Sequence, residues 1–401
     1  MSLFEKFVKI VQPWIFARRY PLLKVEIEPQ TKILFEDLRT IPAIVCPNHC
    51  RHEDGELLFL ISVLIRQQFK FLAAREMFSS YFGFGGLVLR QLGCFEVNRG
   101  GENPDTVRAT EHQLTSSGGK VVIFPEGEIG YDNDHLEPLE PGAVAIGLDA
   151  YLRLHQQQHQ QDVCIVPLAI SYEFDDAEEV CSELVSRLQS KLSLAPSEES
   201  SLFARTKRIS EAFLESREQA LGLALGTERV IDERVAEVFL ISLQNIAKSL
   251  EYKIPDGSER HKLHHLQSRI FAKSKQASLL EKSKFKHLEK ETLNLNRLRS
   301  IKSDEFDEKS SLHSLADLLC NLDVLITGRL SPAAPQTVVI SSAEPFRMSA
   351  YAEQFRKDRE PTIEYVNEQL RASLQEKLQT MRATHSLSDL GGSSLTLRNS
   401  M

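Results

Sequence analysis

The chain lacks any apolar run long enough to cross a bilayer as a helix. Spanning requires roughly 18 or more consecutive apolar residues. The longest candidate, residues 57–65, is bounded by Glu56 and Arg66. The N-terminus also has no small-residue cleavage site of the kind that ends a signal peptide. We therefore expect a cytoplasmic protein with no transmembrane segment.

Positive charge and patterned cysteines are also scarce. Lys and Arg number 48 against 56 Asp and Glu, and the resulting net charge of −8 argues against a general nucleic-acid binder. The six cysteines form no CxxC pair, which indicates reduced thiols rather than a disulfide framework. A GxSxG motif is absent, which disfavours a serine hydrolase.

The most informative stretch that is present covers residues 41–66. An apolar run from 41 to 46 predicts a buried strand, and the apolar stretch from 57 to 65 predicts a buried helix. His49 and Asp54 lie in the turn between them, with four residues separating the two. A carboxylate is favourable at a helix N-terminus, where it can hold one nitrogen of the imidazole. The other nitrogen is then free to take a proton from a hydroxyl, so the pair is a candidate catalytic dyad.

Apolar strand-like runs alternate with helical patterns between residues 41 and 170, which predicts an α/β sheet with helices on its faces. Strands are expected over 69–73, 95–97, 120–124, 163–170 and 337–340, and helices over 104–117, 141–154 and 361–381. The predicted organisation is a segment over 1–24, a core over 25–177, a helical insertion over 178–330, a final strand and helix over 331–383, and a disordered tail over 384–401.

Two segments could contact a membrane surface. Residues 1–24 combine apolar residues at helical spacing with Trp14 and with the positive charges of Lys6, Lys9, Arg18 and Arg19, as in an interfacial helix. A helix packed on its own domain explains them equally well. Residues 260–302 contain 12 Lys or Arg and 3 Glu, a local net charge of +9. A solvated helical face explains any single charge there, but less readily the run as a whole.

Four short stretches resemble, in order, the four blocks of the glycerolipid acyltransferase superfamily. They are Asn48-His49 with Asp54, the stretch Gly93 to Arg99, Phe124-Pro125-Glu126-Gly127, and Ile165 to Ala169. A later piece, 338–346, is similar to the final strand of that family. Each block alone is weak, but four in order on the expected strands and loops form a strong signal. The resemblance implies a mixed sheet flanked by helices, here interrupted by the long insertion.

The resemblance also implies transfer of a fatty acyl group from an acyl thioester to a hydroxyl of a glycerolipid such as lysophosphatidic acid. His49 would be the general base, and Asp54 would fix its tautomer. By position, Arg99, Glu126 and Gly127 would hold the acceptor, with Phe124, Pro125 and Gly93 belonging to the same substrate-binding blocks. No cofactor or metal is expected. Acyl-CoA or acyl carrier protein would be the co-substrate, and membrane lipid would be reached from a peripheral position.

Two departures and several alternatives remain. The third block continues Glu128-Ile129-Gly130, where the family commonly has Thr-Arg-Ser, and Arg99 is followed by two glycines instead of an acidic residue. Both departures put a phosphate-bearing acceptor in question. The alternatives are a zinc site at Cys46, His49, Cys50 and His52, an acylated Cys50, and a non-catalytic lipid-binding or scaffold protein that keeps the fold. The first two lack the expected spacing and partners, and the intact His49 and Asp54 disfavour the third.

Overall fold

The computed structural model describes residues 3–78, 84–98, 103–115, 118–195, 201–226, 228–307, 310–331 and 334–385. The strands are β1 (Leu23–Ile27), β2 (Ala43–Pro47), β3 (Phe69–Ala74), β4 (Cys94–Val97), β5 (Lys120–Val122), β6 (Cys164–Phe174), β7 (Gln336–Ser342) and β8 (Phe346–Arg347). The helices around them are α1 (Leu3–Arg19), α2 (Pro29–Asp37), α3 (Asp54–Leu64), α4 (Phe84–Gln91), α5 (Pro104–Leu114), α6 (Gly142–Gln156), α13 (Ala352–Lys357) and α14 (Arg359–His385).

The strands form one mixed sheet in the order β1-β7-β6-β2-β5-β3-β4, and β8 pairs with β6. Strands β6, β2, β5, β3 and β4 are parallel to one another, whereas β7 runs antiparallel to β6 and parallel to β1. The parallel strands therefore end at one edge of the sheet. In open α/β sheets, ligands bind outside the carboxyl ends of the strands.

Helices cover both faces of the sheet because its strands carry apolar side chains on both faces. In β2, Ala43 and Val45 pack with α1, α2 and α3, whereas Ile44 and Cys46 pack with α5, α6, α13 and α14. All four side chains are fully buried. This packing fixes the direction in which β2 leaves the sheet, toward the candidate dyad.

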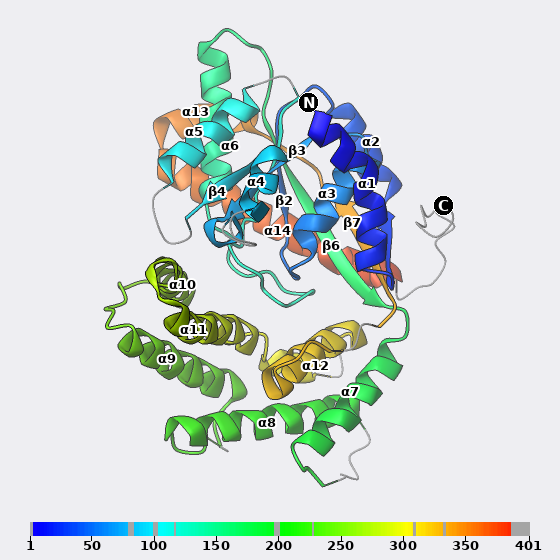
Figure 1. Ribbon diagram of the computed structural model, residues 1–401. Helices are drawn as coiled ribbons and strands as arrows, with labels where there is room; N and C mark the ends of the chain where they lie inside the picture. Colours follow the sequence, from blue (N-terminus) through cyan, green and yellow to red (C-terminus); the bar gives the residue numbers. More distant parts are fainter. Residues whose placement is uncertain are drawn as a thin grey trace.

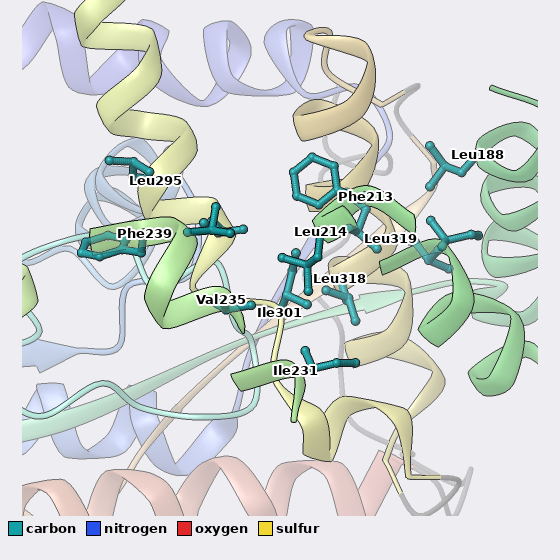
Figure 2. Packing of buried hydrophobic residues seen from close by; sticks show 14 of the residues in the cluster. Leu188, Phe213, Leu214, Ile231, Val235, Phe239, Leu295, Ile301, Leu318 and Leu319 are labelled. Atoms are coloured by element: carbon teal, nitrogen blue, oxygen red, sulfur yellow. The ribbon is translucent and has the colours of Figure 1, made fainter. Parts of the chain in front are cut away.

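Between β6 and β7 the described residues form six α-helices: α7 (Ala177–Lys191), α8 (Leu202–Leu221), α9 (Ile231–Ser249), α10 (Glu259–Gln276), α11 (Leu279–Leu298) and α12 (Leu312–Thr327). They surround their own apolar core, in which Phe213, Phe239 and Leu319 are buried (Figure 2). Figure 1 shows these helices beside one edge of the sheet, with α11 and α12 toward the core. The insertion leaves and rejoins the sheet at adjacent positions, because Phe174 pairs with Gln336.

The predicted fold class, a mixed α/β sheet flanked by helices and followed by helical segments, is confirmed. Several boundaries differ. The helix predicted over 104–117 ends at Leu114, the strand predicted to reach residue 124 ends at Val122, and β6 continues to Phe174 because β7 pairs along it. Of the tail predicted over 384–401, residues 386–401 lie outside the described part. No helix among the described residues is long and apolar enough to cross a membrane.

Candidate active site

His49 and Asp54 meet just beyond the carboxyl end of β2. His49 lies in the loop after the strand, and Asp54 is the first residue of α3. Nδ1 of His49 lies 2.8 Å from Oδ2 of Asp54. His49 Nε2 makes no hydrogen bond to any described residue, and the His49 side chain is 18% exposed. The arrangement leaves one imidazole nitrogen held by the carboxylate and the other open to a substrate proton.

Asp54 is fully buried, and besides His49 two further donors bond to its carboxylate. The hydroxyl of Tyr172 donates to Oδ1 at 2.7 Å, and the backbone N–H of Arg51 donates to Oδ2 at 2.8 Å. The guanidinium of Arg51 lies 4.1 Å from the centre of the Tyr172 ring and donates to Asp317 of α12 at 2.6 Å. Hydrogen bonds thus fix the orientation of the Asp54 carboxylate from β6 and from residues 48–53, the dyad loop. Through Arg51, the insertion also contributes.

Two asparagines extend the sheet where β2 has ended. Asn48 donates to the carbonyl of Ile170 at 2.9 Å and accepts from its N–H at 2.7 Å. Asn133 makes the same pair of bonds with Tyr172, at 2.8 and 3.0 Å. Each side chain replaces a neighbouring strand, so the buried backbone of β6 stays paired. The two asparagines thereby tie the dyad loop and the loop over residues 123–141 to β6.

Phe124 and Glu126 support His49 from the end of β5. The rings of His49 and Phe124 stack with centroids 4.0 Å apart. Glu126 is buried, and its Oε1 accepts from the backbone N–H of His49 at 2.7 Å while Oε2 accepts from that of Glu137 at 3.0 Å. Burial raises the pKa of the Glu126 carboxyl to about 8, against the lowering effect of these two donors. In this structure both carboxylate oxygens of Glu126 therefore accept from backbone N–H groups of the protein.

The two glycines of the substrate-binding blocks lie apart, because Gly127 follows Glu126 after β5, whereas Gly93 precedes β4 at the edge of the sheet opposite the carboxyl ends of the parallel strands. Gly127 has φ +75° in the turn after Pro125, where its N–H donates to the carbonyl of Phe124 at 3.1 Å. Gly93 has φ +77°, and a Cβ there would lie 2.2 Å from Nζ of Lys70. Both positions therefore require glycine. Arg99 lies outside the described residues.

The insertion contacts the loop after Gly127 through polar groups. Arg299 donates to Glu128 at 2.7 Å and to Glu137 at 2.6 Å, and Asn296 donates to the carbonyl of Ile129 at 2.6 Å. On α10, Arg260 donates to the carbonyl of Glu126 at 2.5 Å. The third block thus has Glu128 and Ile129 where the family commonly has Thr and Arg, and positive charge comes instead from the insertion. Part of the basic run over 260–302 faces the core.

Glu128 lies at the centre of this contact and is buried. Burial alone would raise the pKa of its carboxyl, but His264 at 3.5 Å, together with the charges of Arg299 and Arg260, holds the pKa below its usual value. The charges of the insertion and of the loop therefore depend on each other, because removing either leaves the other buried without a partner.

The geometry gives little support to an acylated Cys50 or to a zinc site. Cys50 is buried, and burial raises the pKa of its thiol well above the usual value, which keeps it protonated and a poor nucleophile. In the described part of the chain, no three His, Cys, Asp or Glu side chains are grouped as a metal site would need.

Sequence reasoning missed Tyr172 and Arg51. Tyr172 lies 118 positions from Asp54, in a strand that was expected to end at residue 170. A large polar side chain beyond the end of a buried strand is a weak signal by itself. The sequence around Arg51 is typical of an exposed loop, and its partner Asp317 is 266 positions away in the chain. Neither contact follows from spacing.

Comparison with known proteins agrees with this centre. Residues 30–171 match the family model described as Acyltransferase, a stretch that contains the dyad and most of the core sheet. No curated protein matches the chain. Strands β2 and β5, most of β6 and the loops that carry His49, Asp54 and Glu126 fall inside the matched range. Residues 30–171 are therefore a domain of the glycerolipid acyltransferase superfamily, and this domain supports a general acyltransferase activity.

Proposed function

We propose that the protein transfers a fatty acyl group from a thioester, acyl-CoA or acyl carrier protein, to a hydroxyl of a glycerolipid acceptor such as lysophosphatidic acid. The observation that carries this proposal is the His49–Asp54 hydrogen bond at the carboxyl end of β2, within the acyltransferase domain. The free Nε2 supports its use as a base toward an alcohol.

In the proposed reaction, Nε2 of His49 takes the proton of the acceptor hydroxyl as its oxygen attacks the thioester carbonyl carbon. Asp54 holds the imidazole in the tautomer that leaves Nε2 unprotonated, and it stabilises the imidazolium that forms. The tetrahedral intermediate then releases the thiolate, which receives the proton from His49. The carbon–oxygen bond forms and the carbon–sulfur bond breaks, so no acyl-enzyme is needed.

We assign Arg99 to the polar head of the acceptor, because a guanidinium can donate two parallel hydrogen bonds to phosphate. Gly127 gives the backbone close access to a ligand. Glu126 acts in this proposal through the backbone of His49, which it holds in place. We also propose that the protein works while bound peripherally to a membrane, since acceptor and product both reside there.

The test is acyl transfer by the purified full chain. A panel of lysolipids is incubated with acyl-CoA or acyl carrier protein, and products are measured by mass spectrometry. His49→Ala should lower turnover at least about 100-fold, as expected for loss of a general base. The matched control is His112→Ala, an exposed histidine on α5.

Near-normal turnover by His49→Ala, with the fold intact by circular dichroism, would remove the mechanism. Lysolipid binding without transfer from any donor would favour the non-catalytic lipid-binding protein instead.

A further inference from the structure

A cavity of about 510 Å³ lies between the dyad loop and the helical insertion. Residues 50–53, which connect His49 to Asp54, form part of its wall, as do residues 20–23 of the core. Helices α7 and α12 provide the opposite side with Val180, Leu184 and Val324. The volume falls within the range of about 300–1,000 Å³ that is usual for small-molecule sites. Most of its lining is apolar, including Leu23 and Phe174.

The arginines around this cavity differ in whether they have acidic partners. Arg19 pairs with Glu56, Arg51 with Asp317, and Arg187 with Asp323. Arg297, on the last turn of α11, has no carboxylate partner in the described part of the chain.

Arg297 is nevertheless enclosed. The residue is 8% exposed, and its guanidinium lies 4.4 Å from the centre of the Tyr131 ring. A buried guanidinium is costly unless an anion or hydrogen-bond acceptors satisfy it, and one aromatic face uses none of its five N–H donors. Arg297 is therefore a mostly enclosed cation in the cavity wall whose guanidinium N–H donors bond to no described residue and are open to water or to a ligand.

Other titratable groups in the cavity leave room for an anion beside Arg297. His52 lies within hydrogen-bond distance of Tyr131, with its Nε2 2.9 Å from the hydroxyl. The surrounding protein and the nearby charge of Arg297 lower the pKa of His52 to about 4, so this imidazole is neutral near pH 7. Asp317 is engaged by Arg51, Glu183 is exposed, and burial raises the pKa of Glu53.

We propose that this cavity binds a single-chain lipid with an anionic head, the head on Arg297 and the chain along the apolar wall of α7 and α12. The inference rests on the proposed function, because it places the acceptor lipid beside residues 50–53, and it adds Arg297 of the insertion to Arg99 as a second group for the anionic head. It also gives the insertion a direct part in substrate binding. The shared chemistry is an anionic oxygen group on one hydrocarbon chain, which either a lysophospholipid or a fatty acid supplies.

The experiment measures binding to the full chain by calorimetry, below the critical micelle concentration and without acyl donor. The probes are oleoyl lysophosphatidic acid, oleate, uncharged monooleoylglycerol and inorganic phosphate. Arg297→Gln should weaken the binding of lysophosphatidic acid at least tenfold, as expected for loss of charge-assisted hydrogen bonds. The affinity for monooleoylglycerol should not change. Arg269→Gln is the matched control, because Arg269 also lies over a tyrosine ring, that of Tyr252, but is exposed and outside this cavity.

A second variant tests the apolar wall independently of Arg297. Val180→Trp narrows the cavity and should weaken the binding of all three oleoyl probes without improving the binding of phosphate. Tighter binding of oleate than of lysophosphatidic acid would identify a fatty acid as the source of the anion and overturn the acceptor assignment. Equal lysophosphatidic acid affinity in the two arginine variants, or phosphate binding as tight as the lipid, would overturn the proposal.

These outcomes are separable from failure of the proposed function. His49→Ala should bind lysophosphatidic acid normally even though it does not transfer acyl groups. Loss of turnover in His49→Ala together with unchanged lipid binding by Arg297→Gln would leave the function standing and remove the cavity assignment.

Discussion

At the scale of single residues, the Tyr172 hydroxyl is the contact that distinguishes this dyad from a simple His–Asp pair. It donates to the buried Asp54 from inside β6. Tyr172→Phe keeps the ring that packs under Arg51 and removes only the donor. A hydrogen bond to a charged group contributes about 1.5–3 kcal/mol, and part of this should appear in the transition state, where the imidazolium needs a well-placed carboxylate. We expect kcat to fall about tenfold, with little change in KM.

The readout is steady-state kinetics of the purified variant under saturating donor. A purely structural role would lower the melting temperature without the selective loss of kcat. Tyr151→Phe, on α6 and away from the dyad, provides the matched control.

Glu126 should give the stability of the protein a distinct pH dependence. Burial raises its pKa from 4.5 to about 8, so between these values the folded state binds more protons than the unfolded chain. The free energy of unfolding contributed by this group therefore falls as pH rises from about 5 to about 8. Denaturant unfolding at pH 6 and pH 8 measures the slope, and Glu126→Gln should flatten it. An unchanged slope in the variant would assign the effect to other groups.

At the scale of elements, the contact between α11 and the loop after Gly127 holds the insertion on the core. Arg299 joins the buried Glu128 and Glu137 in one contact. Arg299→Gln leaves two carboxylates without that cation, and breaking a buried pair in this way costs about 3–5 kcal/mol. We expect lower thermal stability and faster hydrogen exchange at residues 126–137. Exchange mass spectrometry measures this, with Arg269→Gln as the control; equal exchange in both variants would contradict it.

Helices and strands were predictable from the sequence where the pattern of apolar residues within the segment itself determines the structure. The apolar runs of β2 and β5 and the Pro that begins α5 place these segments correctly. The full length of β6 was not predictable, because residues 171–174 are held by pairing with β7 more than 160 positions later. The insertion was predictable as helical from its spacing. Its docking on Glu128 was not, since the partners of Arg299 lie 171 and 162 positions away.

In the candidate site, too, contacts within one loop were predictable, whereas contacts with distant segments were not. His49 and Asp54 are close in sequence, so the geometry of one loop was enough to predict their meeting. The role of Glu126 in holding the acceptor stays a prediction, and the structure adds that its carboxylate accepts two backbone N–H groups. A motif identifies which residues matter, but the direction of a side chain depends on donors that other segments supply.

At the scale of the whole molecule, two surfaces are available for the proposed membrane contact. Helix α1 leaves Ile10, Trp14 and Ile15 exposed at 77%, 53% and 49%. Helix α11 exposes the lysines at 282, 284 and 286. An interfacial helix binds weakly alone, and an anionic leaflet contributes about 1 kcal/mol for each nearby Lys or Arg.

Vesicle co-sedimentation should therefore rise with anionic lipid content and fall with added salt. It should drop when residues 1–24 are removed, and drop further when the three lysines become Gln. If the lysine changes leave vesicle binding intact but raise the KM for acyl carrier protein, α11 is a dock for the donor. The membrane contact would then depend on α1 alone.

The pairing of Phe174 with Gln336 has a consequence for how the chain folds. Closing a long flexible loop costs entropy that grows with its length, and long-range strand pairing is correspondingly slow. Helices α7 and α12, the first and last of the insertion, pack against each other, so a folded insertion already holds its two ends together. The helices would then act as a preassembled turn for the hairpin β6–β7. In pulse-labelled refolding, amides of α7 and α12 should gain protection before those of β7, and the reverse order would show that the sheet closes without their help.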